Sequence, residues 1–415
     1  MRLLFLTPQV PYPPQQGTTI RNLNIIARLA SRHQVTLLSF AAPENTLEAV
    51  SPLRAMCEAV HTVPQPVRTG LKRLRTTLTS SLPDMAYRLE SSAFRAMLER
   101  LLATQDFHVI EFEGIEMIPY LPTALEHARQ ADPRPCLVFD DHNAEYVLQK
   151  RVFQADVWAP RRWLGALYSL AQWQKLRSYE AWACRRADVV VAVSDRDAES
   201  LRRIVPGLQV HVVPNGVDPA YYALPIPDGF LPPNCLVFTG KMDFRPNVDA
   251  VLWFADRVLP LIRKSIPGVQ FYIVGQRPHA RLERLRSQTG VVITGHVPDQ
   301  RPYIGGATVY VIPLRSGGGT RLKVLEAMAM RRPIVSTSMG CDGFPVTPGR
   351  EAIVADDPFS FAHHTVELLC DATRRVELGQ AGYDFAKAHY DWDRIVPWLE
   401  QTYGSGKGSG GPVSS

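Results

Sequence analysis

The sequence has few cysteines and no long apolar run. Its six cysteines are scattered over 415 residues, none at a CxxC or Cys/His spacing, so we expect reduced, mostly buried thiols in a cytoplasmic protein. No window approaches the roughly 18 uninterrupted apolar residues of a membrane span. The opening stretch MRLLFLTPQVPYPP breaks at prolines, and its apolar run is too short for a signal peptide.

The chain also lacks a strong excess of one charge. Its formal net charge is +6, and charged residues make up 21% of the composition. Mild basicity suits anionic ligands or a membrane surface, but no dense basic tract interleaved with aromatics indicates a nucleic-acid groove. We therefore expect no nucleic-acid partner.

Two common nucleotide-binding fingerprints are missing as well. No GxGxxG follows the strand pattern RLLFLT or the strand pattern CLVFTG, and GGGTRLK lacks the GxxxxGK[ST] spacing. A classical NAD site and a P-loop are therefore excluded.

What is present is an alternation of short apolar runs with helical patterns. The runs are RLLFLT, QVTLLSF, HVIEFE, CLVFDD, DVVVAVS and QVHVVP, followed by CLVFTG, VQFYIVG, VVITGHV, TVYVIPL and PIVSTS. Near-continuous apolar runs are typical of parallel strands covered on both faces, and the alternation fits βαβ units. The sequence predicts an α/β protein with two Rossmann-like domains.

A stretch rich in proline and turn residues, 216–234, separates the two series of runs and is predicted to be a linker. We place an N-terminal domain at 1–215 and a C-terminal domain at 235–390. The helical pattern at 391–403 is expected to return to the first domain. The Gly/Ser-rich stretch 404–415 has the composition of a flexible tail.

The stretch SGGGTRLKVLEAMA places two cations where an isolated helix does not favour them. We expect Thr320 to be the N-cap of a helix, which puts Arg321 and Lys323 in its first turn. The helix dipole is already positive there, and each cation costs roughly 0.3–1 kcal/mol. A bound anion is the simplest explanation for their position.

The residues around these cations indicate which anion it is. Gly317–Gly319 let backbone amides approach a ligand closely, and Glu326 lies on the helix face of Lys323 with its carboxylate free to lean toward the glycines. Phosphates near the glycines and hydroxyls near Glu326 describe a nucleoside diphosphate. The alternative is a loop with a solvated Arg/Lys pair and Glu326 paired with Lys323. The position after TVYVIPL favours the ligand site, because open α/β sheets bind ligands at the carboxyl ends of strands.

The segment TVYVIPLRSGGGTRLKVLEAMAMRRPIVST resembles the donor-binding motif of retaining family 4 glycosyltransferases, whose GT-B fold has two Rossmann-like domains facing across a cleft. GVVITGHVPD and HVVPNGVD resemble two further segments of that family, and the resemblance is strongest over 188–345. It implies a nucleotide-sugar donor between the two domains, with backbone near the base at His296 and Val297. The donor-binding residues that it implies at the glycine motif are Gly318, Gly319, Thr320, Arg321, Leu322, Lys323 and Glu326.

The family motif is usually Glu-x7-Glu. Glu326 matches the second glutamate, which binds the donor ribose in such enzymes. Gly318 stands in place of the first, which contacts the transferred sugar, so that contact is missing or comes from elsewhere.

A second departure concerns the cations after the first strand of the second domain. The family typically has an Arg and a Lys there, both on the diphosphate. Here Lys241 follows Gly240 at the first place and Pro246 stands at the second, with Arg245 just before it. We predict Gly240, Lys241 and Arg245 as donor-binding residues, and we infer that the cationic clamp has partly moved to Arg321 and Lys323.

The first domain offers three candidates. Gly17 matches a glycine-containing first loop that reaches the donor in similar enzymes, although it also fits an ordinary turn. Glu113 in HVIEFEGIE matches a histidine near the reacting sugar. His142 in DDHNAE is a hydrogen-bond donor toward the sugar or acceptor, with a structural role as the alternative. We predict Glu113, His142 and Arg321 as catalytic.

We expect no metal and no cofactor. Asp195-Arg196-Asp197 spells the DxD that binds Mn²⁺ in GT-A glycosyltransferases, but Ser194 and Asp197 have the spacing of a capping box, which explains the motif without metal. Two basic and aromatic stretches, Arg68–Arg75 and Trp158–Arg186, fit either contact with a lipid-linked acceptor or membrane, or a solvated face and a core-facing helix.

These features predict a hexosyltransferase that moves a sugar from a nucleotide-diphosphate sugar to the hydroxyl of a sugar, lipid-linked or small-molecule acceptor in polysaccharide or glycoconjugate biosynthesis. We expect it in the cytoplasm or peripherally at the membrane. The resemblance implies retention of configuration, in which the acceptor attacks from the face that the diphosphate leaves. Two alternatives stay open: a GT-B nucleotide-sugar epimerase and a non-catalytic nucleotide-sugar-binding protein.

Overall fold

The computed structural model describes residues 1–14, 16–42, 47–157, 163–223, 225–227, 229–317 and 321–405. These residues form two compact units. The first comprises Met1–Pro214 and the chain from Asp393 onward, and the second is Asn215–Trp392. The described part of the predicted linker, 216–234, thus belongs to the second unit, where it includes the short helix α10 (Pro219–Tyr222).

A parallel sheet is the centre of the first unit. Its seven strands, within the described residues, have the order β3-β2-β1-β4-β5-β6-β7. Their bounds are β1 (Arg2–Thr7), β2 (Gln34–Ala41), β3 (Ala59–Pro64), β4 (Val109–Glu113), β5 (Cys136–Asp141), β6 (Val189–Ala192) and β7 (His211–Val212).

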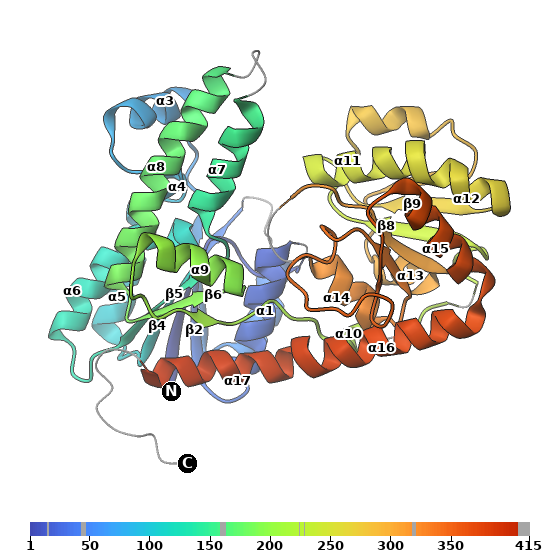
Figure 1. Ribbon diagram of the computed structural model, residues 1–415. Helices are drawn as coiled ribbons and strands as arrows, with labels where there is room; N and C mark the ends of the chain where they lie inside the picture. The colour runs from blue at the N-terminus through green and yellow to red at the C-terminus, as the bar shows by residue number, and fades with distance from the viewer. Residues whose placement is uncertain are drawn as a thin grey trace. The chain divides into compact units, whose positions relative to one another are not determined.

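Helices cover this sheet, and three of them, α3, α7 and α8, extend away from it (Figure 1). The helices are α1 (Gly17–Ala30), α2 (Leu47–Met56), α3 (Gly70–Thr79), α4 (Asp84–Arg88), α5 (Ser92–Thr104), α6 (Leu121–Gln130), α7 (Glu145–Asp156), α8 (Trp163–Arg186), α9 (Asp195–Ile204) and α17 (Trp392–Thr402), with 3-10 turns η1 (Ile115–Tyr120) and η5 (Tyr403–Ser405).

The second unit has its own parallel sheet, in the order β10-β9-β8-β11-β12-β13. The strands are β8 (Cys235–Thr239), β9 (Gln270–Val274), β10 (Val291–Gly295), β11 (Val309–Ile312), β12 (Ile334–Ser336) and β13 (Ile353–Val354). Besides α10, the helical segments are α11 (Arg245–Trp253), η3 (Phe254–Val258), α12 (Leu259–Ser265), η4 (Ala280–Leu285), α13 (Arg301–Gly306), α14 (Leu322–Ala329), α15 (Pro358–Cys370) and α16 (Ala372–Tyr390).

Burial explains why these segments are strands. Every residue of β4, β6, β8 and β11 is buried, as expected for parallel strands that helices cover on both faces. The prediction of two Rossmann-like α/β domains is confirmed, and each of the eleven predicted runs contains a strand. Two edge strands were missed: β3 is mostly half-buried or exposed, and β13 has only two residues.

Each sheet has a point at which the strand order reverses, between β1 and β4 in the first unit and between β8 and β11 in the second. Ligands of open α/β sheets bind at the carboxyl ends of the strands at this point. In the second unit, Gly275 after β9 allows a close approach to the β8 turn, because a Cβ on Gly275 would lie 1.7 Å from the carbonyl oxygen of Gly240. The carboxyl ends of the two strand pairs are therefore where the functional site should be sought.

The last described segment packs on the first unit. His33 Nε2 lies 2.8 Å from Glu400 Oε1 of α17, and Tyr403 donates its hydroxyl proton to Glu111 Oε2 at 2.6 Å. The C-terminal segment therefore contributes a hydrogen bond to a buried carboxylate of β4.

Several smaller expectations can be compared with the structure. All six cysteines are free, and four of them are buried, which confirms mostly buried thiols without disulfides. The Ser194 hydroxyl accepts from the backbone N–H of Asp197 and caps α9, so the capping role is confirmed. Within the described ranges, no helix combines the length and the apolar character needed to cross a membrane.

Candidate active site

Lys323 belongs to α14, the helix that follows β11, and its side chain reaches the end of β8, the neighbouring strand at the switch point of the second unit. Its ammonium group donates to the carbonyl oxygen of Thr239 at 2.8 Å and to Asn247 Oδ1 at 3.0 Å. It also lies 4.0 Å from the centre of the Phe238 ring. The helix that follows β11 thus places a cation directly at the end of β8.

The surroundings of Lys323 disfavour its charge while no anion is bound. The pKa of Lys323 is lowered from 10.5 to about 7, mainly by burial, with Glu326 opposing the shift and the charge of Arg321 adding to it. A phosphate beside this amine would favour the charged form. The arrangement therefore suits an anion better than an empty site.

Glu326 lies one turn further along α14, facing α10. The Tyr222 hydroxyl is hydrogen-bonded to its carboxylate. Burial raises the pKa of Glu326, while Lys323 and Tyr222 oppose that rise. A half-buried carboxylate with one hydroxyl partner can accept further hydroxyls, such as those of a ribose.

The start of α14 differs from the prediction in one respect. The helix begins at Leu322, with Arg321 at the N-cap position, whereas Lys323 stands in the first turn. The prediction that Arg321 stands in the first turn is therefore wrong. The Arg321 side chain is 7% exposed and lies against Gly317, where a Cβ would be 3.1 Å from its Nη2. The predicted residues Gly318, Gly319 and Thr320 lie outside the described residues.

The other predicted donor-binding residues lie at the same edge of this sheet. Gly240 has φ +154°, and a Cβ there would lie 2.8 Å from Asn247 Nδ2 and 3.1 Å from Lys323 Nζ. Lys241 is half exposed, 3.8 Å from Asp243. Arg245 is exposed at the start of α11.

The base-side candidates follow β10. His296 is exposed and Val297 is half-buried, next to the strand end at Gly295. Gly240, Lys241, Lys323 and the β10 end therefore share the carboxyl edge of one sheet.

The first unit brings Glu113 and His142 together. Glu113 is the last residue of β4, and His142 follows β5, its neighbour in the sheet. His142 Nε2 lies 2.7 Å from Glu113 Oε2. Gly114, which follows Glu113, has φ +86°, a backbone conformation that favours glycine. The sequence placed both residues at the ends of strands, and the sheet register makes them neighbours.

The guanidinium of Arg21 lies near three buried carboxylates, of which Glu113 is one. Arg21 of α1 donates to Asp140 Oδ2 from Nε at 3.0 Å and from Nη2 at 2.7 Å. Glu111 and Glu113 lie nearby and, like Asp140, are 0% exposed. Isolated buried charge is costly unless it is paired or neutralised, so Arg21 holds this cluster together.

The cluster changes the protonation of both predicted residues. Burial, and then the charge of Asp140, raise the pKa of Glu113 well above its ordinary value, against the effect of Arg21. Burial lowers the pKa of His142. Both shifts favour the uncharged forms, a protonated carboxyl that donates and a neutral imidazole that accepts across the 2.7 Å contact.

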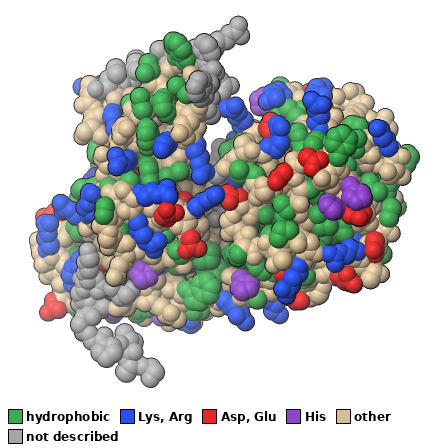
Figure 2. Space-filling model, in the orientation of Figure 1, with side chains coloured by type: hydrophobic (Ala, Val, Ile, Leu, Met, Phe, Trp, Pro, Cys, Tyr) green, Lys and Arg blue, Asp and Glu red, His purple; other side chains and the backbone are tan. Residues whose placement is uncertain are grey.

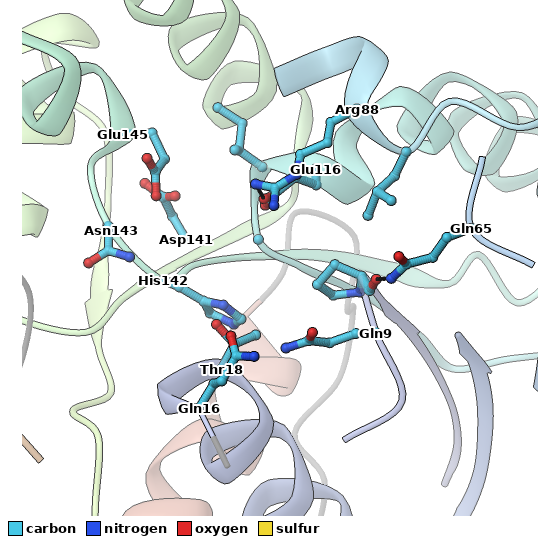
Figure 3. Close-up of a pocket in the computed structure, with 14 residues that line it drawn as sticks. Gln9, Gln16, Thr18, Gln65, Arg88, Glu116, Asp141, His142, Asn143 and Glu145 are labelled. Atoms are coloured by element: carbon cyan, nitrogen blue, oxygen red, sulfur yellow. Dashed lines mark hydrogen bonds and ion pairs between the residues drawn. The ribbon is translucent and has the colours of Figure 1, made fainter. Parts of the chain in front are cut away.

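A polar pocket of about 240 Å³ opens in front of His142. Figure 3 shows its ring pointing toward Gln16 and Thr18, at the start of α1, with Gln9 and Gln65 on another wall. Arg88 and Glu116 form an ion pair at 3.4 Å on its rim. Gly17 is the exposed first residue of α1, between two lining residues. Amides and carboxylates are the groups that bind sugar hydroxyls through hydrogen bonds.

The atoms of Glu113, Asp140 and His142 that could bind a metal lie within 4.8 Å of one another. The fixed cation of Arg21 already bonds Asp140, so a divalent ion at this place would face a buried arginine. The donor set fits the guanidinium better than a metal.

Sequence reasoning missed four residues of the two sites. Asn247 and Tyr222 bond the predicted residues Lys323 and Glu326. Arg21 and Asp140 bond each other, and both act on the pKa of the predicted Glu113. In the sequence, Arg21 looks like any charged residue of a helix, because its partner Asp140 lies 119 positions away. Asp140 stands within DDHNAE and carried a signal, because it ends a strand beside His142.

We expect Glu113→Gln and His142→Ala to lower kcat by about a hundredfold, the low end of what a positioned proton-transfer group contributes. Nucleoside diphosphate affinity should hardly change, because both residues lie in the first unit and the phosphate-side cations in the second. Steady-state kinetics with calorimetric titration separates the two effects. Loss of nucleotide affinity with unaltered kcat would place the pair on the donor side instead.

Comparison with known proteins adds the family. Residues 16–221 match the family model described as Glycosyltransferase Family 4, and residues 233–371 match the model described as Glycosyl transferases group 1. Solved structures share the fold over 97% of this chain. HepE of Anabaena, solved with UDP and glucose, is 14% identical, with 99% of its own chain covered and a TM-score of 0.63. Sucrose-phosphate synthase of Thermosynechococcus elongatus is 18% identical, with 98% of its own chain covered and a TM-score of 0.67.

Curated relatives are more similar in sequence but match over part of their length. A GDP-mannose-dependent α-(1-6)-phosphatidylinositol monomannoside mannosyltransferase of Mycobacterium tuberculosis is 30% identical over 34% of this chain and 40% of its own. The lipopolysaccharide core biosynthesis mannosyltransferase LpcC of Rhizobium leguminosarum is 25% identical over 58% of this chain and 71% of its own. An uncharacterized 44.6 kDa protein from the cps region of Klebsiella pneumoniae is 25% identical, with 39% and 44% covered. The chain thus spans less than half of the length of two of these relatives. The two family models together cover both of its units, and the chain belongs to glycosyltransferase family 4.

Proposed function

We propose that this protein is a glycosyltransferase that moves a hexose from a nucleotide-diphosphate sugar to an acceptor hydroxyl with retention of configuration. The observation that carries the proposal is the position of Lys323, which reaches from α14 to Thr239 at 2.8 Å. It puts a cation and a helix start at the switch point of the second sheet, where phosphate groups are bound in folds of this kind.

The rest of the donor site follows from α14. Glu326 lies one helical turn beyond Lys323, so a ribose at its carboxylate would place the diphosphate toward Lys323 and the Gly240 turn. Lys241 and Arg245 add positive charge at the same edge. These cations stabilise the charge that develops on the diphosphate as it leaves, an effect often worth several kcal/mol.

The sugar side of the reaction is assigned to the pocket of the first unit. The acceptor hydroxyl attacks from the face that the diphosphate leaves, and the leaving phosphate takes the proton, so no protein nucleophile is required. Glu113 and His142, in contact at 2.7 Å beside this pocket, orient the reacting sugar. Membership of family 4 supports retention, and the two relatives named as mannosyltransferases support a hexose donor.

A thermal-shift panel tests the proposal first. GDP-mannose, UDP-glucose and ADP-glucose are each added at increasing concentration, with the free nucleosides as controls. A ligand at about 100 times its Kd adds about 2.7 kcal/mol to the stability of the folded state. We expect one nucleotide-sugar to raise the melting temperature strongly and the others weakly.

Turnover then decides between this activity and its alternatives. With the stabilising donor and a panel of acceptors, proton NMR should show a product with the anomeric configuration of the donor. An inverted product would contradict retention. Conversion of the nucleotide-sugar to its epimer without acceptor would show an epimerase, and tight binding without turnover would show a binding protein.

A further inference from the structure

A second pocket, of about 550 Å³, adjoins the polar pocket of the first unit. Gln65, Arg88 and Leu89 line both. Its remaining walls come from the segment before α3, from α3 and α4, and from the long helices α7 and α8. Described residues of the two stretches that the sequence presents separately thus line one cavity: Arg68 and Arg73 from the first, and Tyr168, Gln172 and Leu176 from the second.

The charges that line this pocket are mostly positive. The pocket is lined by Arg68, Arg73 and Arg88 and by one carboxylate, that of Asp84. Arg68 donates to Asp84 Oδ1 and to Thr76 Oγ1, each at 2.9 Å, and its side chain is 14% exposed. Arg73 pairs with Asp84 at 3.2 Å and Arg88 pairs with Glu116 at 3.4 Å, but their side chains are 57% and 67% exposed. These two arginines therefore keep solvent-facing N–H groups available to a ligand, while Arg68 fixes the wall.

Gln172 on α8 gives an independent sign of a ligand. It lines the pocket and is 3% exposed. Its Oε1 accepts from the backbone N–H of Asp84 at 2.7 Å, which fixes the orientation of the amide. Its Nε2 then has no hydrogen-bond partner within the described part of the chain. A buried donor in this state is unfavourable, and a ligand oxygen in the pocket would satisfy it.

The other half of the pocket is apolar and continues onto an exposed face. Tyr168 and Leu176 of α8 line it. Beyond it, Trp163 and Leu167 are 61% and 63% exposed, and their i, i+4 spacing puts them on one side of the helix. Figure 2 shows hydrophobic side chains gathered over the region that α8 occupies in Figure 1, with Lys and Arg beside them. Exposed apolar surface of this kind marks an interaction site.

We propose that this second pocket binds the phosphate group of a lipid-linked acceptor, whose alkyl chain lies along the exposed face of α8 formed by Trp163, Leu167 and Tyr168. The sugar of the acceptor then enters the adjoining pocket at His142. Arg88 lines both pockets, so it lies where phosphate and sugar meet. The inference rests on the proposed transferase function, because it assigns the acceptor of that reaction.

Two features separate this ligand from a free phosphorylated sugar. The polar pocket beside His142 has the acidic residues Glu116, Asp141 and Glu145 among its walls and Arg88 as its one lining arginine or lysine among the described residues, so the phosphate is assigned to the arginine pocket, which offers more cations. A small polar molecule would leave the apolar wall and the exposed aromatic residue beside it in contact with water, whereas an alkyl chain would cover them.

Calorimetric titration with three probes tests the inference. They are decyl phosphate, decyl glucoside and inorganic phosphate, with the alkyl probes kept below the concentration at which they form micelles. We expect decyl phosphate to bind at least tenfold more tightly than either of the others. Equal binding of inorganic phosphate would overturn the lipid part, and equal binding of decyl glucoside would overturn the phosphate part.

The binding of decyl phosphate to variants tests whether the phosphate site is this pocket. Arg73→Gln removes a charge-assisted contact and should weaken decyl phosphate binding about tenfold, whereas Arg75→Gln on the same helix removes an exposed charge outside the pocket and should not. Gln172→Glu keeps the acceptor for Asp84 but replaces the unpaired donor by negative charge, so binding should be lost. Similar affinities of the Arg73→Gln and Arg75→Gln proteins would contradict the assignment.

The same proteins are titrated with the nucleoside diphosphate that binds the parent. Nucleotide binding should be unchanged in every variant, because these residues belong to the first unit. If nucleotide binds the parent protein and decyl phosphate does not, this inference fails while the proposed function stands. If neither binds, both fail.

Discussion

The Lys323→Met protein is expected to bind nucleoside diphosphates at least tenfold more weakly than the parent protein. The ammonium group of Lys323 lies at the end of β8, bonded to Thr239 and Asn247, and a charge-assisted contact to phosphate contributes about 1.5–3 kcal/mol. Unphosphorylated nucleoside lacks the anion and should bind both proteins alike. Calorimetric titration of both ligands measures the difference.

The same variant should lose a pH dependence that the parent shows. The pKa of Lys323 is about 7 in the free protein, and a bound diphosphate raises it, because anions favour the charged amine. Between about pH 7 and the raised pKa, binding therefore takes up a proton, so affinity should fall as pH rises, by up to about tenfold per unit. Without Lys323 this fall should be absent.

The pH dependence that Lys323 gives to the stability of the ligand-free protein has the opposite sign to the pH dependence of binding. Its folded pKa lies below the value of 10.5 that it has when unfolded, so the unfolded chain holds more protons between these pH values. The free energy of unfolding should therefore gain from this group as pH rises from about 7 toward 10. Lys264→Met, at an exposed position of α12, is the matched control for both effects. A pH profile of nucleotide affinity that is the same for Lys323→Met and the parent would refute the role of Lys323.

Replacing Arg21 by leucine should be the most destabilising single change in the first unit, at about 3–5 kcal/mol. Arg21 is 1% exposed and holds Asp140, which is 0% exposed, at 2.7 Å. Its removal leaves a buried carboxylate beside Glu111 and Glu113 without its cation. Urea denaturation followed by circular dichroism measures the loss.

Two further proteins show whether the buried charge is the cause. Arg28→Leu removes another arginine of α1, whose partner Asp393 is 74% exposed, and should cost less than about 1 kcal/mol. Combining Arg21→Leu with Asp140→Leu removes both charges and should recover a large part of the lost stability. If the double variant is less stable than Arg21→Leu by the full cost of the second change, packing rather than charge explains the effect.

The sequence predicted the fold well because burial on both faces leaves a strong pattern. CLVFTG and TVYVIPL are almost wholly apolar, and they contain β8 and β11, the strands of the switch point. AVHTVP alternates too weakly to be recognised, because β3 lies at the edge of its sheet and buries little. Strand prediction therefore fails where the physical cause of the pattern is weak.

The site residues that could be predicted were those whose position follows from their own segment of the sequence. Glu113 and His142 each end a strand, so the topology of parallel sheets was enough to expect them at one edge. Their 2.7 Å contact required the neighbouring positions of β4 and β5, which no single segment encodes. The N-terminal limit of α14 was placed one residue too early, an error that helix boundaries commonly show.

Partners distant in the chain left no signal. Tyr222 belongs to the segment predicted as a linker, yet it is hydrogen-bonded to Glu326, and Arg21 bonds a carboxylate on another element. Such contacts follow from tertiary packing, which neither periodicity nor spacing reports. Burial is the largest cause of the raised pKa values of Glu113 and Glu326, and these distant partners modify the shifts.

The most direct test of the account is a calorimetric titration of a nucleoside diphosphate and its nucleoside into the parent and Glu326→Gln proteins, with GDP and guanosine as one pair and UDP and uridine as the other. We place the ribose at Glu326, so the variant should bind both members of the recognised pair more than tenfold more weakly. Its melting temperature without ligand should stay close to that of the parent. A parent protein that binds neither diphosphate, or a folded Glu326→Gln protein that binds as the parent does, would contradict the assignment of the donor site to this edge of the second sheet.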